Sequence, residues 1–269
     1  MKYNNQTDRL ETTPLSLRTM IIHREHVYYI PRFQRSYCWD QDNIGMLWED
    51  IDSLTADDSG LARFLGAVIL KRAVLAGGTN VPGFDVIDGQ QRLITFFMLL
   101  CVLSNSSWEA GKKLKENGDS ETEKEKGSAL MEYALTTAQG IIYTRGTRAG
   151  QPKIVPSLVD MAEFDWALNY LDFVDNPEVR LFNMSAGSQR AGPLEIATER
   201  IDECLKERLK SAREGSGSNE GLERECNYLK RCLDIVLDEL ELIEVILAEK
   251  HDANEVFDRL NLQGQELTV

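Results

Sequence analysis

The sequence predicts an α+β protein, in which a small mixed sheet with helices is followed by a mainly helical part. Residues 64–70 form a near-continuous apolar run with β-branched side chains, which is typical of a buried strand. Residues 84–87 predict a second strand, and apolar residues at helical spacing predict helices around both. The chain has 269 residues and is 42% hydrophobic, so it can bury a core as one large domain or two smaller ones.

The first part of the chain alternates short extended and helical segments. Residues 15–30 are expected to form a short helix or turn. Pro31 lacks an amide N–H and disfavours helix at the residue before it, so residues 30–39 start extended. Asp40 is a suitable N-cap for the helix that follows. That helix has apolar residues at helical spacing: Ile44, Leu47, Trp48, Ile51 and Leu54.

After residue 90 the pattern becomes mainly helical. A strongly apolar helix is expected from residue 90 to about 104. Residues 111–127 are charged and nearly free of large apolar side chains, which predicts a solvated loop or a frayed helix. The later elements expected are a strand at 153–158, a helix opening at Asp160, helices at 194–212 and 222–236, a strand at 239–248 and a short helix at 252–260.

Charge and composition exclude several classes of protein. A net charge of −14 argues against a broad basic DNA-binding surface. Residues 1–100 hold 10 Lys+Arg against 12 Asp+Glu, so the arginines there can still form a local anion site. No run approaches the ~20 apolar residues of a membrane span, and no secretory signal is evident. Five cysteines without a Cys-x-x-Cys pair, and three histidines, predict neither a disulfide framework nor a zinc site. We therefore expect a cytoplasmic protein that does not enter a membrane.

The strand–turn–helix at Asp88–Gly89 is the first candidate site. A helix N-terminus offers free N–H groups and the positive end of the helix dipole, so it attracts anions. Gly89 would let a phosphate approach the backbone. Gln90 and Gln91 offer amide donors, and the guanidinium of Arg92 suits phosphate oxygens. The alternative is structural: Asp88 caps the helix, and its carboxylate then occupies the place of the phosphate.

Arg32, Gln34 and Arg35 form a second polar cluster, flanked by three aromatic residues. In an extended chain Arg32 and Gln34 project to one face and Arg35 to the other. One of these arginines could then reach an anion at the Asp88 turn. In the alternative interpretation, Arg35 pairs with an acidic neighbour such as Asp40 or Asp88, and the aromatic residues belong to the core.

Four motifs, in order, resemble the DGQQR-motif domain found at the N-terminus of GmrSD-type modification-dependent restriction enzymes and related phage-defence proteins. They are residues 30–39 (IPRFQRSYCW), 64–70 (FLGAVIL), 85–93 (DVIDGQQRL) and 256–268 (VFDRLNLQGQELT). The resemblance spans about residues 15–269, and the ordered set is far more specific than any single motif. The charged segment 111–127 departs from the usual family pattern but touches no motif.

The resemblance implies a fold similar to ParB and sulfiredoxin, in which an Asp-Gly turn and an Arg on the next helix meet a nucleotide. It implies a ParB-like nucleotide-binding subdomain over residues 1–110 and a mainly helical subdomain over 111–269 that completes the same domain. It also implies NTP binding with hydrolysis. The residues that match are Asp88, Gly89, Gln90, Gln91 and Arg92, with Gln34 and Arg35 as supporting contacts beside Arg32.

Catalytic roles follow for two of these residues. Arg92 would stabilise negative charge on the transferred phosphoryl group, and Asp88 would hold Mg²⁺ or position water. There is no Walker-type lysine loop, so the protein would not be a P-loop enzyme.

The same resemblance also bears on partners and on alternative functions. Family members often continue into a His-Asn-His nuclease domain, for which this sequence carries no motif. DNA would then be reached through a further domain or a partner, and an oligomer is compatible with the pattern. Two alternatives stay open: a non-catalytic module that recognises phosphate or modified DNA, and a structural domain in which Asp88 caps the helix and Arg92 pairs.

Overall fold

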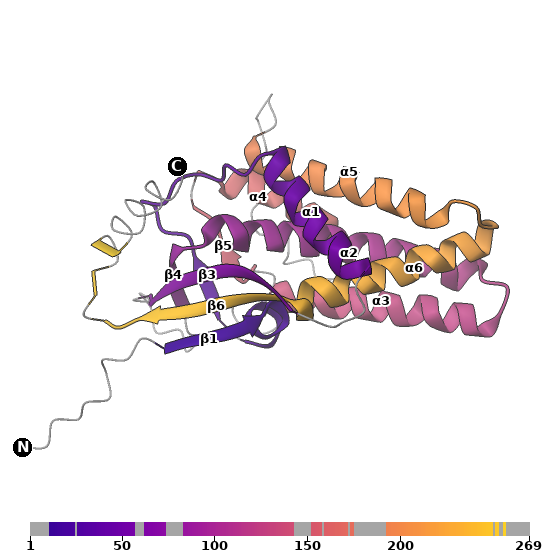
Figure 1. Ribbon diagram of the computed structural model, residues 1–269, viewed down its shortest axis with the longest axis horizontal. Coiled ribbons are helices and arrows are strands. Elements are labelled where there is room, and N and C mark those ends of the chain that lie inside the picture. The colour runs from indigo at the N-terminus through magenta and orange to yellow at the C-terminus, as the bar shows by residue number, and fades with distance from the viewer. Residues whose placement is uncertain are drawn as a thin grey trace, which may run out of the picture.

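A curled mixed sheet meets a group of long helices in the computed structural model, which confirms the predicted α+β class (Figure 1). The structure describes residues 11–24, 26–56, 62–73, 83–142, 152–157, 159–171, 173–174, 192–249, 251–252 and 255–256. The motif at 256–268 and most of the helix expected at 252–260 therefore lie outside the described residues.

The sheet has the order β1-β6-β3-β4-β2-β5. Its strands are β1 (Glu11–Ser16), β2 (Val27–Tyr29), β3 (Arg63–Arg72), β4 (Gly83–Asp88), β5 (Ile154–Val155) and β6 (Leu240–Leu247). The β1/β6 and β3/β4 pairs are antiparallel, and the β3/β6, β2/β4 and β2/β5 pairs are parallel. Because β6 lies between β1 and β3, the two parts predicted from the sequence share one sheet.

The helices gather on one side of this sheet and extend beyond it (Figure 1). They are α1 (Gln41–Ala56), α2 (Gln90–Asn117), α3 (Glu121–Ile141), α4 (Met161–Leu168), α5 (Pro193–Arg213) and α6 (Ser218–Asp234), with short turns η1 (Arg18–His23), η3 (Asn169–Leu171) and η4 (Ile235–Glu239). Asp40 caps α1 as predicted, because its Oδ1 accepts from the N–H groups of Asp42 and Asn43 at 3.1 and 3.0 Å.

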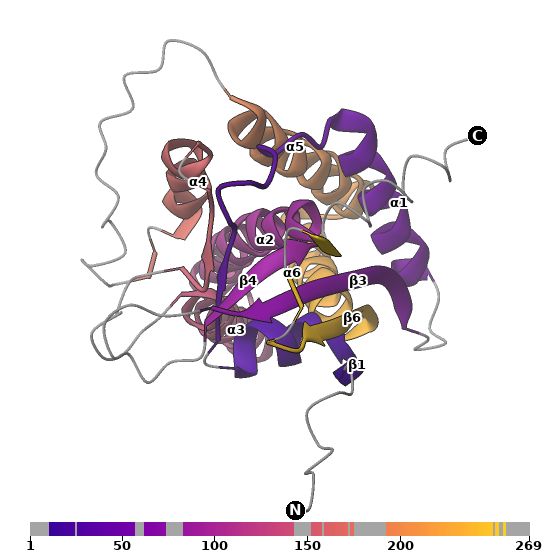
Figure 2. The same ribbon diagram turned by 90° about the vertical axis from the view of Figure 1, so that its left-hand side faces the viewer.

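Helix α2 is the central element of the core. It packs against α3, α5 and α6, and every residue from 93 to 104 is buried. By length and composition alone it could cross a membrane, but 78% of its most apolar window is buried inside the fold. Figure 2 looks along α2 and shows the other elements arranged around it. We therefore interpret α2 as the core helix of this fold.

The prediction of a solvated loop or a frayed helix at 111–127 was wrong, because most of this segment belongs to two packed helices. Helix α2 continues to Asn117, and α3 begins at Glu121 after a tight turn. The two helices cross where Gly111 and Gly127 meet backbone to backbone: a Cβ added to Gly127 would lie 2.5 Å from the carbonyl oxygen of Gly111. A contact this close needs small residues, so the hairpin lacks the large apolar side chains by which a packed helix is usually recognised.

Two further differences concern the strands. The prediction of a helix or turn at 15–30 holds for η1 only, since β1 and β2 lie on either side of it. In β3 the strand is confirmed but full burial is not. Val68 and Leu70 are buried, whereas the side chain of Phe64 near the start of the strand is 57% exposed. Burial alternates along the last residues of β3 because one face of the strand packs on the core.

Candidate functional site

The turn between β4 and α2 is built around Gly89. This residue has φ 92° and ψ 7°, in the left-handed region that side chains disfavour by roughly 1–2 kcal/mol. A Cβ at this position would also lie 3.0 Å from both the carbonyl oxygen of Ala67 and Cγ2 of Val68. The backbone conformation and the close approach of β3 therefore both require glycine.

The N-terminus of α2 leaves three backbone donors open. The first helical bond runs from the N–H of Leu93 to the carbonyl oxygen of Gly89 at 3.1 Å. Among the described residues, the N–H groups of Gln90, Gln91 and Arg92 donate to no other group. Such groups at a helix N-terminus, together with the helix dipole, favour an anion.

Asp88 does not cap this helix, so the capping interpretation was wrong. The N-cap position belongs to Gly89, and no side chain accepts from the first turn. Asp88 is the last residue of β4 and is half-buried. Within the part of the chain that the structure describes, its carboxylate makes no hydrogen bond or ion pair. The carboxylate at the end of β4 is thus not committed to any described partner.

The two glutamines of the motif contact backbone groups of segment 34–38. Gln90 Nε2 donates to the carbonyl oxygen of Arg35 at 2.7 Å, and Gln91 Nε2 donates to that of Ser36 at 3.2 Å. Gln91 Oε1 accepts from the N–H of Cys38 at 2.9 Å. Both glutamine side chains are buried. Their contact with nucleotide stays a prediction, while the structure gives them a role in holding this segment.

Gln34 ties the other end of the segment to β4. Its side chain is buried, and Nε2 donates to the carbonyl oxygen of Ile87 at 2.7 Å. The neighbouring arginines, Arg32 and Arg35, are exposed. The expectation that Arg32 and Gln34 share a face was therefore wrong. The cause is a turn, in which the N–H of Gln34 donates to the carbonyl oxygen of Pro31 at 3.1 Å.

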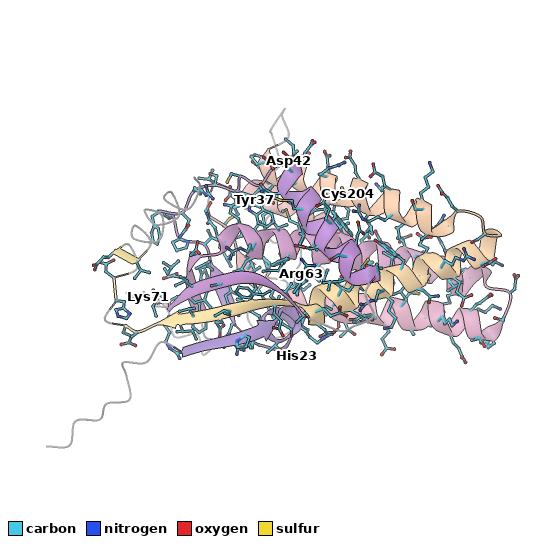
Figure 3. The ribbon with its side chains drawn as sticks, in the orientation of Figure 1. His23, Tyr37, Asp42, Arg63, Lys71 and Cys204 are labelled. Carbon is cyan, nitrogen blue, oxygen red and sulfur yellow. The ribbon has the colours of Figure 1, made fainter. Side chains whose placement is uncertain are left out.

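Arg35 presents an uncommitted cation next to the turn. Its carbonyl oxygen is held by Gln90, but its guanidinium forms no ion pair with Asp40, Asp88 or any other described residue. The alternative of an Arg35 ion pair is thus not observed. Figure 2 shows the chain before α1 passing across the N-terminal end of α2. The aromatic residues differ as well: Tyr37, labelled in Figure 3, is buried, whereas Phe33 is 45% exposed.

Arg92 lies along β3 instead of projecting from the turn. Its Nη1 donates to the carbonyl oxygen of Ala67 at 2.5 Å. Gly66 makes room for the guanidinium, because a Cβ there would lie 3.1 Å from Cζ of Arg92. Gly66 has φ 112° and sits where the β3/β6 register shifts. Arg92 therefore links the turn to β3, and its other guanidinium donors bond to no described residue.

Sequence reasoning missed two residues of this region, Asp160 and Thr95. Both carboxylate oxygens of Asp160 lie 3.3 Å from the N–H of Tyr37, and Ser157 Oγ donates to Oδ2 at 3.1 Å. Burial raises the pKa of Asp160. Thr95 Oγ1 shares a hydrogen bond of 2.8 Å with the hydroxyl of Tyr37, whose pKa is raised by burial. Only the three-dimensional contact marks these residues, since Asp160 looks like an ordinary helix start in the sequence.

Among the residues that the structure describes, no group of three or more His, Cys, Asp or Glu side chains could hold a metal ion. The five cysteines are free thiols; Cys38 is exposed and the other four are buried.

Fold and site together define a class: a mixed α+β domain in which a strand, a left-handed glycine and a buried helix carry the DGQQR sequence. The family model described as "GmrSD restriction endonuclease, N-terminal domain" matches residues 17–269. The chain belongs to this family, which confirms the resemblance and places it among restriction and phage-defence proteins. No curated protein matches the chain.

Proposed function

We propose that this domain binds a nucleoside triphosphate at the β4–α2 turn and hydrolyses it, as the regulatory part of a cytoplasmic defence protein. The observation that carries the proposal is the row of three open N–H groups on Gln90, Gln91 and Arg92. A buried left-handed glycine holds these groups open at the start of the core helix. Open donors in such a place fit a phosphate group.

Cations around the turn support the same ligand. Arg35 is exposed on the segment whose backbone Gln90 holds, and Arg32 is exposed three residues earlier. The guanidinium of Arg92 has further donors that bond to no described residue after its bond to Ala67. The chain as a whole carries −14, so these arginines offer local rather than broad affinity for phosphate. This balance favours a small phosphate ligand over the alternative, a non-catalytic module for DNA phosphates or modified DNA.

Asp88 is the residue proposed for the hydrolytic step. Its half-buried carboxylate, which has no partner among the described residues, is the motif side chain with the basicity to accept a proton from water, and it can also bind a cation. Mg²⁺ in phosphate sites commonly takes one or two carboxylates together with substrate oxygens, so a single Asp88 is compatible with it. Mg²⁺ would supply charge neutralisation on the phosphates. Asp88 would hold the ion or orient the attacking water, and Arg92 would face the developing charge.

The test combines binding and phosphate release with each of the four NTPs. Wild type is expected to bind at least one NTP and to release phosphate. Asp88→Ala should lose release and retain binding, and Arg35→Ala should weaken binding about tenfold or more. Arg224→Ala is the control, because Arg224 is an exposed arginine on α6 that forms a surface pair with Glu220. A folded wild type that binds none of the four NTPs would overturn the proposal.

A further inference from the structure

Segment 34–38 is held from two sides by side chains. It forms no strand or helix, so its backbone groups need other partners. On one side α2 supplies them through Gln90 and Gln91. On the other side Asp160 accepts from the N–H of Tyr37 with both carboxylate oxygens at 3.3 Å. The exposed Arg35 therefore lies on a stretch of backbone fixed between two anchors.

The second anchor is itself fixed by the core. Asp160 directly precedes α4, and Phe164 on α4 stacks on Phe97 of α2 with ring centroids 4.6 Å apart. Glu163 ties α4 to α5, because its Oε2 accepts from the N–H of Leu194 at 3.0 Å. Helix α4 thus keeps its place independently of segment 34–38, and Asp160 offers that segment a rigid point of attachment.

Burial of the Asp160 carboxylate costs folding free energy that its hydrogen bonds do not offset. The residue is only 5% exposed, and among the described residues it bonds to the neutral donors of Tyr37 and Ser157 rather than to a cation. A buried carboxylate without a cation is unfavourable for folding. Asp160 therefore fixes the Tyr37 amide through hydrogen bonds and adds no stabilising ion pair to a described residue.

From this geometry we infer that Asp160 is a positioning residue of the nucleotide site, which acts through the Tyr37 amide to hold Arg35 in place. The inference rests on the proposed function. An arginine on fixed backbone loses less conformational freedom when it binds a phosphate, so the anchor raises affinity without touching the ligand.

Nucleotide titration of single and double variants tests the coupling. Asp160→Ala removes the acceptor for the Tyr37 amide and should weaken NTP binding about tenfold. Asp160→Asn keeps an oxygen in the same place and should stay within about threefold of wild type. In an Arg35→Ala background, Asp160→Ala should cause almost no further loss, because the two residues act in series. The inference is overturned if the affinity losses of Asp160→Ala and Arg35→Ala simply add in the double variant. It is also overturned if Asp160→Asn binds NTP as weakly as Asp160→Ala.

Cys38 offers a readout that needs no nucleotide. It is the one exposed thiol of the five cysteines, and it lies next to Tyr37 in the segment. A nitroxide attached to Cys38 should give a broad, ordered spectrum in wild type and Asp160→Asn, and a narrower one in Asp160→Ala. Arg224→Ala, which removes an exposed surface pair on α6, is the control and should leave the spectrum unchanged. An unchanged spectrum in folded Asp160→Ala contradicts the inference.

The two readouts separate the possible failures. If wild type binds no NTP but the Cys38 spectrum responds to Asp160→Ala, the proposed function fails while Asp160 is still shown to hold the segment. If NTP binds and neither affinity nor spectrum responds to Asp160→Ala, the inference alone fails.

Discussion

The two ends of α2 differ in how their terminal backbone groups are hydrogen-bonded. At the C-terminal end the chain bonds to itself, because the N–H of Gly118 donates to the carbonyl oxygen of Leu114 at 2.9 Å. Ser120 and Glu123 then cap α3 reciprocally, with bonds of 3.2 and 3.1 Å. At the N-terminal end, no side chain caps the helix and three N–H groups stay open.

The two ends of α2 also differ in how deeply they are buried. The capped turn at Ser120 is exposed, where water could have satisfied the same groups. The uncapped end lies where Gly89, Gln90 and Gln91 are buried, and open donors cost more there. The C-terminal end of α2 (the hairpin end) is therefore arranged for folding, whereas the N-terminal end (the sheet end) leaves buried donors open, as the proposed phosphate site requires. Substitutions at the two ends should separate these properties.

The largest effect on stability is expected at the hairpin. Gly127→Ala would place a Cβ 2.5 Å from the carbonyl oxygen of Gly111 and 2.6 Å from the amide nitrogen of Lys115. Both neighbours are backbone, so the helices must separate, at a cost of about 3 kcal/mol. Urea unfolding measures the loss, and NTP affinity of the folded protein should stay unchanged. Gly45→Ala in α1, where no atom lies within 4 Å, should instead stabilise the protein slightly.

The next effect concerns the sheet end, where stability and binding should fall together. Gly89→Ala imposes left-handed strain and a contact with Ala67 and Val68, about 2 kcal/mol in total. Because the open donors shift with this residue, NTP affinity should fall at least tenfold. Gly215→Ala is the control, since Gly215 has φ 76° with no atom within 4 Å. Gly215→Ala should lose stability through the backbone strain alone and bind NTP normally. Unchanged NTP affinity in Gly89→Ala would show that the open donors do not bind the phosphate.

The difference between the two ends of α2 also explains which features could be predicted from the sequence. Asp88, Gly89 and the apolar residues after them are neighbours in the chain, so the turn and the core helix were predictable from local pattern. The hairpin was not, because its close crossing replaces large apolar residues with Gly111 and Gly127. The Ser120-x-x-Glu123 capping box was a readable signal of the α3 start that the charged composition obscured.

The site was predictable only in part, for a related reason. The motif residues were identified, yet the directions of their side chains depend on contacts between distant segments. Gln90 and Gln91 contact backbone some 55 residues earlier, and Arg92 contacts β3. Asp160 reaches Tyr37 across 123 residues. No local period or spacing encodes such pairs.

A smaller effect is expected from the cap of α3. Ser120→Ala removes the acceptor for the N–H of Glu123, which should lower the free energy of unfolding by about 1 kcal/mol. Ser120→Thr keeps the acceptor and should lose only a fraction of that. Neither substitution should alter NTP affinity or phosphate release. A change in either property would show that the two ends of α2 are coupled.

The smallest expected effect is on stability, and it depends on pH through Asp160. Burial raises the pKa of Asp160 above its ordinary value near 3.8, so the folded protein holds this proton more tightly than the unfolded chain. The contribution of Asp160 to stability is therefore lost as pH rises through its folded pKa, and the ionised carboxylate destabilises the fold at pH 7. Asp160→Asn should unfold at a slightly higher urea concentration than wild type at pH 7, and this advantage should shrink as pH is lowered toward 4. If Asp160→Asn were instead less stable at pH 7, the ionised carboxylate would be a stabilising contact, and the destabilisation expected from its burial would be contradicted.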